Sequence, residues 1–224
     1  MYYRHLLMIF LFVGVLAGCN NESLSNSGDG LADSINFPDS KISGARIDLF
    51  DGNQMTTEIL ADRIIEFNDS DSSIAYTLDI TNFDSLKQET SIITGDSGII
   101  REQAGFVVIY GNVVVITKDL TFDSLNQESS RITGDSGIIH EQTDESVIYG
   151  NVVVITEDST KLETEVLHWN PETGRIHTDA FVRFTTNDGS ILRGWGFEAD
   201  QRIREYTIFH RVSGETEVTG LSEP

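Results

Sequence analysis

Two identical tetrapeptides hold the residues of this chain that most suggest covalent chemistry. Gly-Asp-Ser-Gly occurs at residues 95–98 and again at residues 134–137. A serine nucleophile needs a histidine base and backbone amides that stabilise an oxyanion. The only histidine before the first copy is His5, an isoleucine follows each copy, and the motif is duplicated. We therefore interpret both copies as turns that reverse a strand, and we expect no catalytic residue here.

The other polar side chains lack the spacing of familiar metal sites. Residues 68–72, Asn-Asp-Ser-Asp-Ser, offer oxygens to Ca²⁺, but the glycine and distal glutamate of a calcium-binding loop are absent. His140, His168, His177 and His210 have neither the i, i+4 nor the cysteine-linked spacing of zinc sites. Among 36 acidic residues, no pair stands out as an acid and base couple. The sequence predicts no metal site, no cofactor and no enzyme.

The single cysteine, Cys19, follows an apolar N-terminal segment. The run from Leu6 to Ala17 is preceded by a short basic start and is shorter than the ~20 residues that span a bilayer. It ends in Leu-Ala-Gly-Cys, which looks like a bacterial lipobox, where the cysteine thiol receives a diacylglycerol and the chain is cut before it. We expect residues 1–18 to be a lipoprotein signal peptide and Cys19 to be lipidated. The alternative is an ordinary signal peptide with a chance cysteine.

Composition divides the rest of the chain into three parts. Residues 19–40 are rich in Asn, Ser, Gly and Asp and predict a flexible tether. Residues 41–218 predict one all-β domain, and residues 219–224 a disordered tail.

The formal net charge of −21 repels phosphates, so nucleic acid is excluded as a partner.

A 39-residue repeat lies at the centre of the predicted domain. The segment from Phe83 to Asp119 returns from Phe122 to Asp158, with Tyr-Gly-Asn-Val-Val-Val-Ile-Thr present in both copies. A period of this size indicates one supersecondary unit stacked on a copy of itself. The β-branched runs between Gly, Asp and Asn predict that the unit is built from strands. We therefore expect an elongated sheet that offers a long surface.

Alternation of apolar and polar residues predicts which side chains face the interior. Asp51-Gly52 and Asp188-Gly189 are two-residue hairpin signals, and residues 170–174 form a longer turn. Between the turn at 170–174 and the turn at Asp188-Gly189, apolar residues occupy every second position, which is typical of a strand with one dry face. The candidate interior residues are Val113, Val115, Val152, Val154, Ile176, Val182, Phe184, Trp195 and Phe197. In the repeat strands Val114 and Ile116 are apolar as well, so alternation does not decide which face of these strands points inward.

The second half of the chain resembles a known family. Leu-Glu-Thr-Glu-Val-Leu-His-Trp at 162–169, Gly-Arg-Ile-His-Thr-Asp at 174–179 and Gly-Ser-Ile-Leu-Arg-Gly-Trp-Gly-Phe at 189–197 resemble the C-terminal half of LptC-type lipopolysaccharide export proteins. The Phe-Asp-Gly turn at 50–52 and the Gly-Asn-Val elements fit the wider OstA/LptA superfamily. The resemblance extends from about Ser43 to Gly214.

The resemblance implies an open, twisted antiparallel β-jelly roll that shields the acyl chains of lipid A. It implies that such a protein accepts lipopolysaccharide from an inner-membrane ABC exporter and passes it to an LptA-like periplasmic bridge protein. Exposed first and last strands would pair with these partners. The candidate edge residues are Ile47, Leu49, Phe50, Tyr206, Ile208 and Val212.

Two features depart from the family pattern. A predicted lipid anchor at Cys19 replaces the usual transmembrane helix, which places the protein in the periplasm, most simply at the inner membrane. Asn20 follows the cysteine, where enteric lipoproteins of the inner membrane carry Asp, so the outer membrane stays an alternative. The alternative function is a structural β-repeat surface lipoprotein, a scaffold or adhesin without lipid transport.

Overall fold

The computed structural model describes residues 38–67, 72–101, 103–119, 127–140 and 145–215. Within these residues the chain forms strands and no helix. The predicted signal peptide, Cys19, the C-terminal tail and most of the acidic loop at 68–72 lie outside the described residues. The strands are β1 Ser40–Asp51, β2 Gln54–Phe67, β3 Ser72–Phe83, β4 Glu89–Arg101, β5 Phe106–Asp119, β6 Gln127–His140, β7 Glu145–Thr156, β8 Lys161–Asn170, β9 Arg175–Thr185, β10 Ile191–Asp200 and β11 Tyr206–Glu215.

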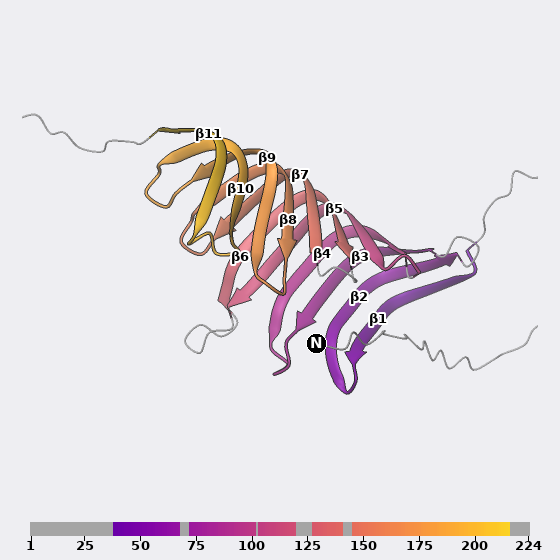
Figure 1. Cartoon of the computed structure of the whole chain (residues 1–224). Helices are drawn as coiled ribbons and strands as arrows, with labels where there is room; N and C mark the ends of the chain where they lie inside the picture. Colours follow the sequence, from indigo (N-terminus) through magenta and orange to yellow (C-terminus); the bar gives the residue numbers. More distant parts are fainter. Residues whose placement is uncertain (1–37, 68–71, 102, 120–126, 141–144, 216–224) are drawn as a thin grey trace, which may run out of the picture. The chain divides into compact units, whose positions relative to one another are not determined.

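All of these strands belong to one antiparallel sheet. Their order in the sheet is their order in the chain, from β1 to β11, so every strand is bonded to its sequence neighbours (Figure 1). The sheet does not close, because β1 pairs only with β2 and β11 pairs only with β10. The prediction of an all-β fold with an open antiparallel sheet is confirmed.

The predicted turns join neighbouring strands, and glycine supplies the conformation that they need. Gly52 has a φ of 62° between β1 and β2, which L-residues adopt only under strain. Gly174 closes the connection between β8 and β9 with the same φ of 62°. The Asp188-Gly189 hairpin forms, but its connection is longer than two residues, since β9 ends at Thr185 and β10 begins at Ile191.

The strands bend sharply near their middles. Register shifts occur between Thr94 and Ser97 in β4 and between Tyr110 and Val113 in β5. In β5 the bend consists of Gly111 and Asn112, whose φ angles are 74° and 48°. Such bulges increase the twist of a strand and turn its direction. The bends divide the sheet from β4 to β10 into two arms. The first arm contains the part of β5 before its bend and the residues paired with it, and the second arm contains the part of β5 after its bend and the residues paired with it.

Our interpretation of Gly-Asp-Ser-Gly as a strand-reversing turn is wrong. Both copies lie inside strands, at the bends of β4 and β6. Asn112 donates a hydrogen bond from Nδ2 to Oδ2 of Asp96 at 2.8 Å, and Asn151 does the same to Asp135 at 2.9 Å. The motif therefore bends a strand that continues beyond it, and the aspartate is used to hold the neighbouring bend.

The repeat corresponds to two successive hairpins. The hairpin β4–β5 holds the first copy, and the hairpin β6–β7 holds the second. Equivalent positions have equivalent environments: Ile109 and Ile148 are both buried, as are Val113 and Val152. The repeat therefore adds strands to the middle of the sheet and leaves both edges to other parts of the sequence.

Candidate lipid-binding interior and sheet edges

One face of the sheet carries an unbroken apolar row that crosses ten strands. Successive members of this row are directly paired, from Ile47 in β1 to Leu192 in β10. The row consists of Ile47, Ile59, Ile80, Ile93, Val115, Ile132, Val154, Leu162, Phe184 and Leu192. Because each side chain stands opposite the next at about 5 Å, the row forms one continuous apolar track.

The two arms of the sheet fold towards each other over this track. A Cβ built on Gly137 in the first arm of β6 would lie 3.6 Å from Cγ1 of Val113, which belongs to the second arm of β5. Buried apolar residues from both arms form one core cluster. The described strands form one sheet, so the apolar residues of one arm can be covered only by the other arm. The interior is therefore the space between the two arms.

The two ends of the interior are lined differently. At the β1–β3 end the buried residues include Ala45, Ala61 and Ala75. At the β11 end, the ring centroid of Phe184 lies 4.4 Å from that of Tyr206 and 5.7 Å from that of Phe197. Ile64, Leu78 and Ile80 are buried at the same end as the alanines. Alanine and larger aliphatic side chains therefore line one end, and three aromatic rings meet at the other.

A polar row, buried from Ser91 to Thr156 and partly buried at Thr57 and Asn82, runs beside the apolar row. It crosses six strands through directly paired residues: Thr57, Asn82, Ser91, Thr117, Ser130 and Thr156. Neighbours bond to each other, with Thr57 donating to Asn82 at 3.0 Å and Asn82 donating to Ser91 at 2.9 Å. Oγ1 of Thr117 lies 2.7 Å from Oγ of Ser130. These mutual bonds satisfy polar groups that burial would otherwise leave unpaired.

The structure buries the predicted interior residues with one exception. The residues that are at most 2% exposed are Val113, Val115, Val152, Val154, Ile176, Val182, Phe184 and Phe197. Trp195 is 46% exposed and is not an interior residue. Gly196 has a φ of 73°, and the register shifts between Trp195 and Phe197, so the two side chains point to opposite faces. The role of the buried set in lipid binding stays a prediction.

One interior donor has no partner in the part of the chain that the structure describes. The indole nitrogen Nε1 of Trp169 is buried, and its N–H has no hydrogen-bond acceptor among the described residues. Trp169 is directly paired with Ser146 and with Ile176, and the whole residue is 2% exposed. A buried N–H without an acceptor costs about 1–3 kcal/mol. An acceptor inside the interior would remove this cost.

The predicted edge residues lie on the two open strands. Phe50 and Val212 are about half exposed, and Tyr206 is 40% exposed. Ile47 and Ile208 are partly buried against the core, while Leu49 is half-buried. Each edge strand therefore presents unpaired backbone groups together with apolar side chains. Their contact with partners stays a prediction.

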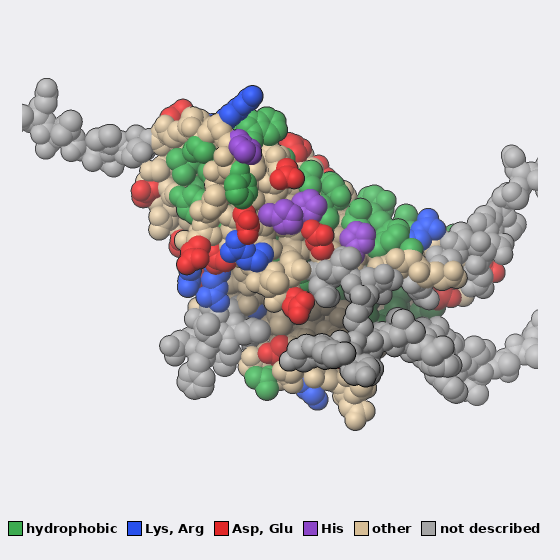
Figure 2. Space-filling model, viewed as in Figure 1, with side chains coloured by type: hydrophobic (Ala, Val, Ile, Leu, Met, Phe, Trp, Pro, Cys, Tyr) green, Lys and Arg blue, Asp and Glu red, His purple; other side chains and the backbone are tan. Residues whose placement is uncertain are grey.

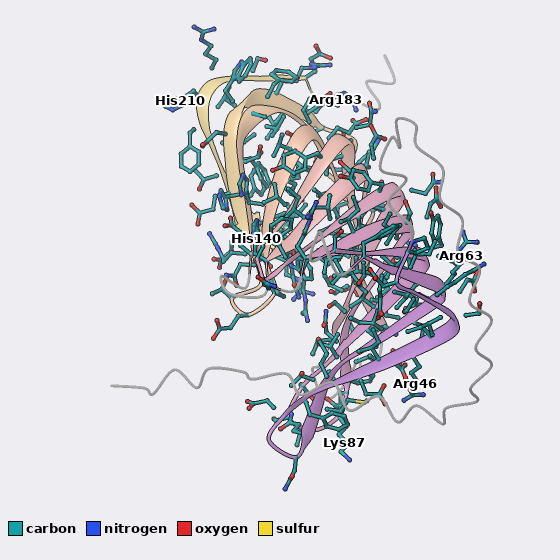
Figure 3. All side chains as sticks on the ribbon, turned by 90° about the vertical axis from the view of Figure 1, so that its right-hand side faces the viewer. Arg46, Arg63, Lys87, His140, Arg183 and His210 are labelled. Carbon is teal, nitrogen blue, oxygen red and sulfur yellow. The ribbon has the colours of Figure 1, made fainter. Side chains whose placement is uncertain are left out.

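The outer face carries paired charges beside exposed apolar side chains such as Phe181 and Trp195. Nζ of Lys161 lies 2.8 Å from Glu163, and Arg183 also binds Glu163. The hydrogen bond from Lys161, followed by that from Arg183, holds the pKa of Glu163 below its ordinary value. At the β1–β3 end the side chain of Arg46 is largely exposed, whereas the guanidinium carbon of Arg63 lies 4.2 Å from the ring centroid of Tyr76 (Figure 3). No helix among the described residues is long and apolar enough to cross a membrane.

A cluster on the outer face was not predicted from sequence. Glu145, His168 and His177 come from β7, β8 and β9, and their donor atoms lie within 4.8 Å of one another. We expected no metal site because the histidine spacing along the chain is irregular. The direct pairing of His168 with His177 brings them together, and only knowledge of this register would have found the cluster.

The fold and the interior define a class: an open, antiparallel β-sheet protein with an apolar interior and two free edges. Residues 118–217 match the family described as LptC, "Lipopolysaccharide-assembly, LptC-related". The resemblance to LptC-type proteins is therefore confirmed over these residues, which include β6 to β11. The first four strands lie outside the matched range.

The chain is also similar to a solved structure. This is the crystal structure of LptH, "the LptA homologous periplasmic component of the conserved lipopolysaccharide transport device from Pseudomonas aeruginosa". The sequence identity is 15%, the TM-score is 0.43, and the match covers 57% of this chain and 94% of LptH. A search of curated proteins finds no significant match.

Proposed function

We propose that this protein is a non-enzymatic, periplasmic carrier in lipopolysaccharide transport that shields acyl chains between the two arms of its sheet. The observation that carries this proposal is the apolar row, which continues through ten strands without a polar interruption. A globular core needs no such continuity, whereas a long acyl chain needs an apolar path of matching length. The family match over residues 118–217 supports the same proposal.

Acyl chains bind in this proposal through burial alone. Each CH₂ group removed from water contributes ~0.8 kcal/mol, so several chains bind firmly without a charged contact. The interior residues are already packed, so the arms must separate to admit a chain. The sheet is open, and this separation breaks no strand pair.

Trp169 offers a polar contact inside this path. Its unpartnered N–H would donate to a carbonyl or hydroxyl oxygen on a bound acyl chain. Such a bond would fix the depth of the chain in the interior, because the indole is held between Ser146 and Ile176.

The open edges suit a relay between neighbouring sheets. In this proposal β1, around residues 46–50, meets an inner-membrane ABC exporter, and β11, around residues 206–212, meets an LptA-like bridge protein. Backbone hydrogen bonds would extend the sheet from one protein into the next. The energy for directed movement would come from the ATPase of the exporter. A lipid on Cys19 would hold the protein at its membrane, with the inner membrane as the simplest site.

Photo-crosslinking within one strand tests the carrier function. A photoreactive residue at Val182 or Phe184 should capture lipopolysaccharide in cells, because both side chains are interior. Phe181 is the matched control, since it lies in the same strand but is 43% exposed on the outer face. Equal capture at Phe181 would contradict an interior path. Failure at both interior positions, with folded and abundant protein, would favour the scaffold alternative.

Two further experiments test the edge and the anchor. Ile208→Pro removes a backbone donor from β11 and should weaken retention of the bridge protein in a pull-down, while interior capture persists. Unchanged retention with an unchanged circular dichroism spectrum would remove this edge from the proposal.

Cys19→Ala should abolish labelling by a palmitate analogue, because only the thiol can receive the lipid. Equal labelling of both proteins would exclude lipidation at Cys19.

A further inference from the structure

Three side chains with metal-binding atoms converge on the outer face of β7, β8 and β9. His168 lies between the buried residues Leu167 and Trp169, so its ring points away from the interior. His177 lies between the buried residues Ile176 and Thr178 and points the same way. The surface view shows histidine side chains next to each other beside acidic side chains (Figure 2). The group is therefore separate from the proposed lipid path.

The strand register fixes this convergence. His168 and His177 are directly paired, and their rings stack with centroids 4.6 Å apart at 18°. Glu145 stands two residues before Val147, the direct partner of His168, which places the carboxylate diagonally opposite the ring. Oε1 of Glu145 lies 2.9 Å from Nδ1 of His168. Three rigid, paired strands thus supply one ligand atom each.

The distances suit a small cation after modest side-chain rotation. The three ligand atoms lie within 4.8 Å of one another, so a point exists that is no more than about 2.8 Å from each of them. The bonds from zinc to nitrogen and oxygen ligands are ~2.0–2.2 Å long. Each donor must therefore move inward by less than about 1 Å. His177 is exposed, and Glu145 and His168 are only half-buried, so these rotations meet little resistance and an ion can reach the site.

The ring nitrogens are available for coordination. Within the described residues, neither nitrogen of His177 has a hydrogen-bond partner, and His168 uses only Nδ1. The basic group next to the cluster, Arg175, is engaged by Glu198 in an ion pair. The net charge of −21 also raises the local concentration of cations.

We propose that Glu145, His168 and His177 form a binding site for a divalent late first-row metal ion such as Zn²⁺. Two imidazoles and one carboxylate suit Zn²⁺, Cu²⁺ or Ni²⁺, whereas Ca²⁺ and Mg²⁺ prefer oxygen ligands alone. Three protein ligands leave a further coordination position open to water. The bound ion would tie β7, β8 and β9 together on the face opposite the acyl path.

Calorimetric titration of the full chain with Zn²⁺ tests the site. We expect one Zn²⁺ per chain at a saturable site, and His168→Gln or His177→Gln should weaken binding at least about tenfold. Glu145→Gln keeps an acceptor for His168 but makes a poor ligand, so it should weaken binding by a similar factor. The matched control is His210→Gln, because this histidine lies on β11, whereas the cluster lies on β7, β8 and β9. Equal loss in the control, or undiminished binding in the His168→Gln/His177→Gln double variant, would overturn the proposal.

A spectroscopic measurement on the unmodified protein does not depend on any variant folding correctly. With one equivalent of Cu²⁺, the electron paramagnetic resonance spectrum should show hyperfine splitting from imidazole nitrogens. A spectrum with oxygen ligands only would overturn the site. Either result stands whether or not the protein carries lipopolysaccharide, because neither measurement involves the interior.

Discussion

Gly95 and Ile109 offer a sharp test of how the bent strands pack. A Cβ added at Gly95 would lie 2.2 Å from Cγ2 of Ile109, while the next atoms are 3.6 Å away. Ile109 is fully buried. The φ of Gly95 is not in the positive region, so alanine fits its backbone. The only obstacle to a side chain at residue 95 is therefore one methyl group of Ile109.

The expected energies follow from this geometry. Gly95→Ala overpacks the interior and should lower the free energy of unfolding by ~1–3 kcal/mol. Ile109→Ala removes the obstructing methyl but leaves a cavity, so it should cost ~2–5 kcal/mol. In the double variant the new methyl occupies part of that cavity. The combined cost should then be at least ~1 kcal/mol smaller than the sum of the single costs.

A double-mutant cycle measured by urea unfolding gives this coupling energy. The repeat supplies an internal replicate, since a Cβ at Gly134 would lie 2.4 Å from Cγ2 of Ile148. Gly52→Ala is the control for additivity. It has its own cost of strain because φ is 62°, but no atom lies within 4 Å of its added Cβ, so this cost should add to that of Ile109→Ala. Costs at Gly95 and Ile109 that add within ~0.5 kcal/mol would refute the reasoning.

Three other perturbations have expected outcomes. Phe184→Ala should lower the free energy of unfolding by ~3–5 kcal/mol, and Phe181→Ala by only about 1 kcal/mol, since one ring is buried and the other is partly exposed; equal shifts in urea midpoint would contradict the assignment of faces. Asn112→Ala should cost ~1–2 kcal/mol, because alanine loses the hydrogen bond to the aspartate and strains a positive φ, whereas Asn112→Gly loses only the bond; a glycine variant less stable than the alanine variant would exclude strain at this bend. The pKa of Glu163 is lowered on folding, so its stabilisation is present above its ordinary value of 4.5 and is lost as the pH falls below it. Glu163→Gln should therefore reduce the loss of stability on acidification, by no more than about 1 kcal/mol because the pair is partly exposed; identical acid unfolding curves would refute this.

Local patterns were sufficient to predict the strands and part of the interior. Apolar residues at alternate positions of β9 predicted the burial of Ile176, Val182 and Phe184, because a strand points successive side chains to opposite faces. The repeat predicted stacked strand units, and Asp51-Gly52 predicted a hairpin. Each of these inferences uses neighbours along the chain, where the geometry is set by a few bonds.

The errors arose where alternation is interrupted or where distant segments meet. Trp195 was assigned to the interior because strict alternation places it with Phe197, but the bulge at Gly196 reverses its face. The pairing of His168 with His177 depends on the register between β8 and β9, which the spacing of residues within either strand does not fix. The duplicated Gly-Asp-Ser-Gly consists of residues that are common in turns. In the bent strands β4 and β6, however, its first glycine allows the side chain of an isoleucine in the neighbouring strand to pack closely.

The position of the repeat makes the length of the sheet a variable that duplication can change without altering its ends. The rows remain in register across a copy, because Ile93 and Ile132 occupy equivalent places in the same apolar row. Removing or adding one 39-residue unit would therefore change the sheet by one hairpin, or roughly 10 Å of width. The strands at the two edges would keep their sequences and their neighbours. A lineage could in this way match the reach of the protein to the gap between its partners, one hairpin at a time.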